Sequence, residues 1–188
     1  MEKRITPNST KIATKWALIY TATAIVITYG TELLSLDPNS AVKYLTFLPF
    51  IAFLCIAQTE FKEELGGYIT YGNAFSAGFR YALFSGLLIG IFTYLYFAFL
   101  SPAMWEKVLE ATQTGMEEKD TPSEQIDKTM EFMRSSWGMI MGAFSSAVMY
   151  AIMGAIISLI TAAIFKKERS PYDIAMAAED STTTDPTA

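Results

Sequence analysis

The chain has 188 residues, of which 52% are hydrophobic and only 18% are charged, and its formal net charge at pH 7 is −5. Soluble domains carry about 25% charged residues, so this composition is too apolar for an average soluble protein and indicates a membrane protein. The acidic balance argues against binding to nucleic acid, and the absence of histidine from the sequence removes the commonest general base and metal ligand.

Four apolar stretches follow one another along the chain. In order they are Trp16 to Leu34, Tyr44 to Thr59, Tyr81 to Leu100 and Trp137 to Phe165. A helix needs roughly 20 apolar residues to cross a hydrocarbon core of about 30 Å. We therefore predict an all-α polytopic membrane protein with four transmembrane helices, at about residues 16–36, 42–60, 74–100 and 137–165. The alternative, that these are buried core helices of a soluble protein, fits only the shorter runs.

Charges in the flanking segments predict the orientation. The basic start MEKRITPNSTK resembles a secretory signal in its order of charges, but no small-residue cleavage pattern follows its long apolar run, which predicts an uncleaved span. Nine lysine and arginine residues fall on the side that holds both ends of the chain, and five fall on the other side. We expect a protein of the cell inner (cytoplasmic) membrane with a cytoplasmic segment at 1–15, a transmembrane domain at 16–168 and a disordered cytoplasmic tail at 169–188.

Two charged residues interrupt the apolar stretches. Glu32 lies at the outer end of the first span, where it could line a proton or cation path or simply reach water. Arg80 falls at the cytoplasmic boundary of the third span, where it could extend to the headgroups or meet Glu60, Glu63 or Glu64. Because the two residues lie at opposite faces of the membrane, we expect no salt bridge between them.

An aromatic stripe occupies residues 66–79, before the third apolar stretch. Its aromatic residues are three or four positions apart and therefore share one face of a helix. This pattern is typical of an interfacial helix or of a bent extension of the third span, and a simple interfacial anchor is the alternative to a ligand site. The candidate residues are Gly66, Gly67, Tyr68, Tyr71, Gly72 and Phe75.

Small residues recur at every fourth position in the third and fourth spans. Such repeats let membrane helices approach closely, so we expect these two spans to pack backbone to backbone. The same pattern would serve a homodimer. The glycines assigned to this packing are Gly78, Gly86, Gly90, Gly138 and Gly142.

The segment at 101–136 is predicted to form an extracytoplasmic helical hairpin. Ser101 and Pro102 are typical of a helix start, and Gly115 is expected to end that helix. The sequence TPSE at 121–124 predicts a capping box for a second helix, which we expect to continue directly into the fourth span. Eight acidic residues against four basic ones give this segment a net charge of −4, most simply the charge of a solvated surface.

Catalytic and metal-binding patterns are missing from the sequence. Cys55 is the single cysteine, and a buried structural thiol is its expected role. Met139 and Met141 would point about 200° apart on a helix, so they are poorly placed to share a copper ion. We therefore predict no catalytic residue, no cofactor and no metal, and we expect that the protein is not an enzyme.

Several segments resemble an uncharacterised family of small bacterial inner-membrane proteins with four spans, defined by a domain of unknown function. They are the basic start, FKEELGGYITYGNAFSAGF, SPAMWEKVLE, and a last span that ends in KK. The resemblance covers roughly residues 10 to 168, and GGYITYGNAF is its most specific part. Membership implies membrane localisation, but no known activity and no catalytic residue.

The leading functional hypothesis is a non-enzymatic envelope scaffold that docks another envelope protein through its outer hairpin. The alternative is a small transporter or channel subunit, which would have to form a homo-oligomer to enclose a pore and would use Glu32 in a polar path. A membrane enzyme comes third, because no carboxylates or hydroxyls are predicted to meet at one depth. The lipid bilayer is the one partner that the sequence itself indicates.

Overall fold

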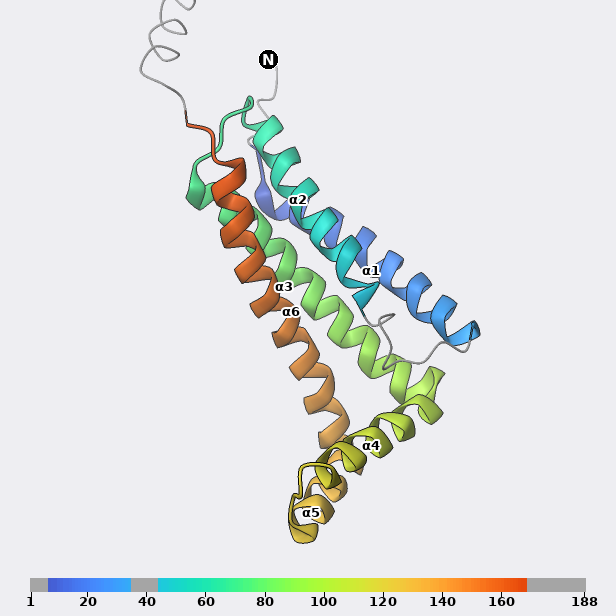
Figure 1. Cartoon of the computed structure of the whole chain (residues 1–188). Coiled ribbons are helices and arrows are strands. Elements are labelled where there is room, and N and C mark those ends of the chain that lie inside the picture. Colours follow the sequence, from blue (N-terminus) through green and yellow to red (C-terminus); the bar gives the residue numbers. More distant parts are fainter. Residues whose placement is uncertain (1–6, 35–43, 169–188) are drawn as a thin grey trace, which may run out of the picture.

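The structure is a computed structural model and describes residues 7–34 and 44–168 (Figure 1). The described residues confirm the predicted all-α class. Their helices are α1 (Ser9–Leu33), α2 (Phe47–Glu64), α3 (Tyr71–Leu95), the π-helical turn η2 (Tyr96–Leu100), α4 (Pro102–Glu117), α5 (Ser123–Arg134) and α6 (Ser136–Phe165). Residues 1–6, 35–43 and 169–188, which include the predicted tail and the start of the predicted second span, lie outside the described residues.

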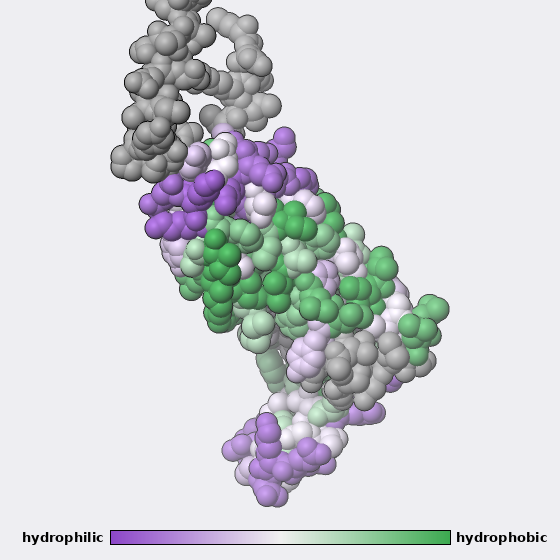
Figure 2. Space-filling model, turned by 45° about the horizontal axis from the view of Figure 1, so that its top comes forward, coloured by the Kyte–Doolittle hydropathy of each residue, from purple (hydrophilic) through white to green (hydrophobic). Residues whose placement is uncertain are grey.

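Three of the described helices are long and apolar enough to cross a membrane. They are α1 with 25 residues, α3 together with η2 with 30 residues, and α6 with 30 residues. Their large apolar side chains face outward, and Figure 2 shows a broad apolar band between two hydrophilic ends. The chain is therefore a multi-pass membrane protein whose apolar helices contact the lipid bilayer.

The second predicted span forms α2, which begins five residues later and ends four residues later than the predicted 42–60. α2 has 18 residues, but charged residues begin at Glu60, so its apolar part covers residues 47–59. At about 1.5 Å per residue this part extends only about 20 Å, which is less than the hydrocarbon thickness of about 30 Å. α2 alone is therefore too short to be a complete span.

The four long helices alternate in direction around a central α3. Arg80 of α3 contacts Ser9 at the start of α1, and Tyr96 of η2 contacts Glu32 at the end of α1, so α1 and α3 are parallel. α2 runs antiparallel to both, because its residue Glu60 meets Lys15 near the start of α1. α6 is also antiparallel to α3, and it packs on the opposite side of α3 from α1 (Figure 1).

Glycines allow α3 and α6 to pack closely. A Cβ atom on Gly86 would lie 2.6 Å from the carbonyl oxygen of Ala147, and one on Gly90 would lie 3.1 Å from that of Ala143. Gly154 of α6 faces Ala82 of α3 so closely that a Cβ atom there would overlap it. These distances are shorter than ordinary van der Waals contacts, so the backbones could not approach this far with larger residues.

Gly138 and Gly142 pack differently from the sequence-based expectation. Gly138 lies against the backbone of Phe132 and Met133, at the junction of α5 and α6. Gly142 faces the ring of Trp105, with 3.6 Å between an added Cβ atom and the ring. Both glycines therefore make room for the α4–α5 segment and not for α3.

The boundaries of α4 and α5 correct three expectations. α4 does begin at Pro102, but it continues past Gly115 to Glu117, since a single glycine within a helix is tolerated. α5 begins at Ser123 after Pro122, without the expected capping hydrogen bond from a side chain. A helix running unbroken from α5 into α6 was also wrong: Ser135 is extended and its hydroxyl accepts a hydrogen bond from the Gly138 amide at 3.1 Å, which starts a new helix.

The aromatic stripe belongs to α3 except for Tyr68, which lies in the turn before this helix and not on the predicted helical face. Thr70 caps α3 by accepting a hydrogen bond from the Asn73 amide at 3.3 Å, so residues 71–79 are the first turns of this long helix and not a separate interfacial helix. Gly66 and Gly67 form the preceding turn with φ angles of 80° and 85°, a left-handed conformation that favours glycine.

Candidate functional site

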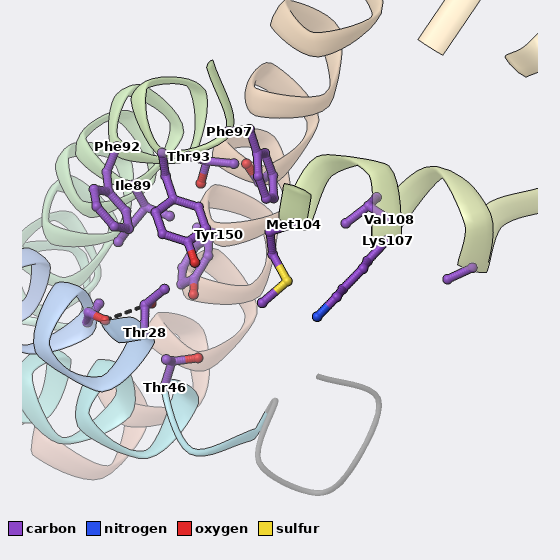
Figure 3. Close-up of a pocket in the computed structure, with 14 residues that line it drawn as sticks. Thr28, Thr46, Ile89, Phe92, Thr93, Phe97, Met104, Lys107, Val108 and Tyr150 are labelled. Atoms are coloured by element: carbon purple, nitrogen blue, oxygen red, sulfur yellow. Dashed lines mark hydrogen bonds between the residues drawn. The ribbon is translucent and has the colours of Figure 1, made fainter. Parts of the chain in front are cut away.

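A cavity opens on the face of α3 that α2 leaves uncovered. α2 covers the half of this face nearest Ser9, between α1 and α6 (Figure 1). α4 lies across the other end of the bundle, and its residues Met104 and Lys107 lie beside the uncovered half (Figures 1 and 3). The resulting space has a volume of about 500 Å³, and we call it the α4-side cavity. Its lining comes from α1 (Ala24, Thr28), from Thr46, from α3 and η2 (Ile89, Phe92, Thr93, Tyr96, Phe97), from α4 (Met104, Lys107, Val108, Ala111) and from α6 (Ser146, Tyr150).

The deep end of the cavity rests on a buried aromatic cluster. Tyr20 is completely buried, and its ring lies 5.3 Å from Phe50, 6.3 Å from Tyr81 and 6.0 Å from Tyr150. The Tyr20 hydroxyl donates to the Tyr150 hydroxyl at 3.0 Å. Tyr150 thus accepts a hydrogen bond from the core, and its own hydroxyl can donate a hydrogen bond to another acceptor.

The opposite end of the cavity carries a single cation. Lys107 of α4 is the one charged residue among the lining side chains of the described chain, and it is exposed. Figure 3 shows its ammonium group extending from α4 beside Met104 toward the cavity. Within the described ranges no carboxylate lies within ion-pair distance of Lys107. The cavity therefore combines an apolar interior with a positive charge at its mouth.

Glu32 is held beside the cavity. Its carboxylate accepts a hydrogen bond from the Tyr96 hydroxyl at 2.8 Å and another from the Ser101 hydroxyl at 2.9 Å. Tyr96 also lines the cavity, and Ser101 is the residue at which α4 begins. These hydrogen bonds connect the end of α1 to η2 and to the start of α4. The Glu32 carboxylate therefore holds together the helices that form this wall of the cavity.

Arg80 has different partners from those expected. Its guanidinium group donates to the Ser9 hydroxyl at 2.7 Å and to the Thr10 hydroxyl at 2.8 Å, at the start of α1. Glu60, one of the expected carboxylate partners, instead accepts hydrogen bonds from Lys15 and Trp16. Arg80 thus lies at the opposite end of the bundle from Glu32, and its role here is to tie α3 to α1.

The aromatic stripe joins the α2–α3 turn to the end of α6. The backbone amide of Ile69 donates to the carbonyl of Lys167 at 2.8 Å, and the amide of Lys167 donates back at 3.0 Å. The Lys167 ammonium lies 5.2 Å from the centre of the Tyr68 ring, and the Tyr71 hydroxyl donates to the Leu159 carbonyl at 3.4 Å. Phe75 stacks on Phe79 with 5.6 Å between ring centres.

A buried polar network, not predicted from the sequence, lies in the half of the bundle nearest Ser9. The Gln58 side-chain amide donates to the Ala74 carbonyl at 3.0 Å and to the Ser158 hydroxyl at 3.2 Å. The Ser158 hydroxyl in turn donates to the Phe75 carbonyl at 3.0 Å. Gly78 leaves the space for this network, because an added Cβ atom would collide with both side chains. The feature of the sequence that could have predicted this network is Gln58, a polar residue inside an apolar stretch.

The helices and the cavity define an integral membrane protein with a largely apolar site between its spans. The described residues hold no group of three histidine, cysteine or acidic side chains that could bind a metal ion. The chain belongs to the DUF4199 family, described as a protein of unknown function, whose family model matches residues 15–167. This match confirms the expected membership of a domain-of-unknown-function family. No curated protein and no solved structure matches the chain.

Proposed function

We propose that the chain crosses the cytoplasmic membrane four times, with both termini in the cytoplasm. The parallel directions of α1 and α3 support this, because the chain must return across the bilayer between them, and α2 makes the inner part of that return. The start of α1 and the end of α6 lie at one end of the bundle, held there by Arg80 and by the bridge between Ile69 and Lys167. Lysine and arginine residues concentrate at this end, as cytoplasmic flanks do.

On this topology α4 and α5 form a hairpin outside the membrane, and we infer that the protein is a non-enzymatic docking protein of the cell envelope. The hairpin has a buried cluster of its own, formed by Trp105, Leu109, Ile126 and Met130, and Phe97 of η2 and Met139 of α6 pack against it. The observation that carries the proposal is that Phe132 and Trp137 remain 52% and 69% exposed at the junction of the hairpin and α6. Aromatic side chains of this kind are the usual anchors of protein interfaces.

The charge of the hairpin indicates the kind of partner. Its eight acidic and four basic residues favour a partner with a basic surface next to an apolar pocket. A transporter or channel subunit remains the alternative function. It is less well supported, since both oxygens of the Glu32 carboxylate accept hydrogen bonds, from the hydroxyls of Tyr96 and Ser101.

Photocrosslinking in living cells tests the docking function. A photoreactive amino acid at Phe132 should give one discrete adduct with an envelope protein, because this side chain would be buried in the partner interface. The charge-reversing substitutions Asp127→Lys and Glu131→Lys should reduce its yield, since they reverse the field that attracts a basic surface. The control places the same photoreactive residue at Phe144, which is 60% exposed on the apolar face of α6 and should crosslink to lipid. Adducts at Phe132 that match those at Phe144 would contradict docking.

A further inference from the structure

We propose that the α4-side cavity binds one zwitterionic phospholipid from the surrounding bilayer. The lipid phosphate lies at Lys107, and one acyl chain lies in the groove along α3 toward Tyr150. This inference depends on the protein being embedded in a membrane but not on the docking role of the hairpin.

The depth of the cavity matches one leaflet of a bilayer. α3 and η2 end at Leu100, and the first residue of α3 that lines the cavity is Ile89. About twelve residues of helix separate Ile89 from Ser101, which corresponds to roughly 18 Å. Half of a hydrocarbon core of about 30 Å is roughly 15 Å. An acyl chain that enters at the α4 end would therefore reach the aromatic cluster near the midplane of the bilayer.

The lining suits an amphiphile. The volume of about 500 Å³ lies within the range of about 300–1,000 Å³ that is usual for ligand pockets. Ala24 of α1, Ile89 and Phe92 of α3 and the Tyr150 ring of α6 give the deep part a mostly apolar wall, and a few hydroxyl groups lie among them. Lys107 is located at the mouth, where α4 has left the membrane.

The surrounding charge distinguishes between lipid headgroups. Lys107 can pair with a phosphate, since no described carboxylate competes for it. Glu106 and Glu110 are exposed near Lys107 on α4, and the whole segment from 101 to 136 has a net charge of −4. This field disfavours a headgroup with net negative charge and favours one in which an ammonium group compensates the phosphate.

Native mass spectrometry of the full chain in mild detergent tests the proposal. Phosphatidylethanolamine should bind with one molecule per monomer and more tightly than phosphatidylglycerol. Lys107→Ala should weaken this binding by about fivefold, the effect expected for one lysine near a membrane surface. Thr93→Phe should abolish it by filling the cavity, whereas Thr93→Val, which keeps the size of the side chain, should not. Lys128→Ala is the matched control, because Lys128 is an exposed lysine of the same hairpin that pairs with Glu124.

Three results would overturn the proposal. They are phosphatidylethanolamine binding that is unaffected by both Lys107→Ala and Thr93→Phe, equal weakening by Lys107→Ala and Lys128→Ala, and preferential binding of phosphatidylglycerol. Thermal denaturation of Thr93→Phe shows whether this variant folds. If it does not, the comparison of Lys107→Ala with Lys128→Ala decides the outcome. Failure of crosslinking at Phe132 would leave this lipid site unaffected.

Discussion

Tyr20→Ala should lower the free energy of unfolding by about 3 kcal/mol, the lower part of the range measured when a buried aromatic residue is replaced by alanine. Tyr20 is completely buried and contacts the rings of Phe50, Tyr81 and Tyr150 from three different helices. Lipid is nearly as apolar as this core, so the loss comes from packing and less from transfer out of water. Thermal denaturation in mild detergent should show a decrease in Tm of roughly 6–12 °C.

Tyr20→Phe is the matched control for this loss. It keeps the ring contacts and removes only the hydrogen bond to Tyr150, which in membrane proteins contributes about 0.6 kcal/mol on average. The Tm of this variant should therefore remain close to that of the natural chain. Equal decreases for Tyr20→Phe and Tyr20→Ala would mean that the hydrogen bond, and not the aromatic packing, holds this part of the bundle together.

Gly86→Ala should destabilise the contact between α3 and α6. The new methyl group would lie 2.6 Å from the carbonyl oxygen of Ala147 and 3.3 Å from the Cβ atom of Tyr150. Because the nearer atom belongs to the backbone, the two helices must move apart, and overpacking of this kind costs about 1–3 kcal/mol. The decrease can be measured by the same thermal denaturation.

Gly72→Ala provides the comparison within the same helix. No atom lies within 4 Å of a Cβ atom added at Gly72, so the substitution meets open space. Alanine also favours a helix over glycine by about 1 kcal/mol, and the Tm should stay unchanged or rise slightly. If Gly86→Ala and Gly72→Ala had the same effect, close backbone approach would not be what stabilises the α3–α6 pair.

Local patterns in the sequence predicted much of the fold. The length of the apolar runs predicted the helices that became α1, α3 and α6, because the requirement to cross hydrocarbon acts on each helix separately. The spacing of Gly78, Gly86 and Gly90 pointed to the face of α3 that contacts α6. The same spacing misassigned Gly138 and Gly142, since a repeat indicates close packing but does not identify the neighbour.

The cavity could not be predicted in this way. It exists because α2 is shorter than the helices beside it and because α4 lines the uncovered part from the far end of the bundle. Both facts concern the relative placement of helices distant in sequence. The partners of Arg80 illustrate the same limit. The charge of Arg80 predicted a carboxylate partner, but its guanidinium group donates to the hydroxyls of Ser9 and Thr10 at the start of α1. Glu60 instead accepts hydrogen bonds from Lys15 and Trp16.

Labelling of single cysteines in whole cells tests the four-crossing topology most directly. Cys55→Ser removes the natural thiol, and Lys11→Cys, Lys128→Cys and Lys166→Cys then report on the start of α1, on α5 and on the end of α6. A maleimide that cannot cross the cytoplasmic membrane should label only the Lys128→Cys variant in intact cells, and the other two only after permeabilisation. Labelling of Lys11→Cys and Lys166→Cys from opposite sides of the membrane would contradict an even number of crossings.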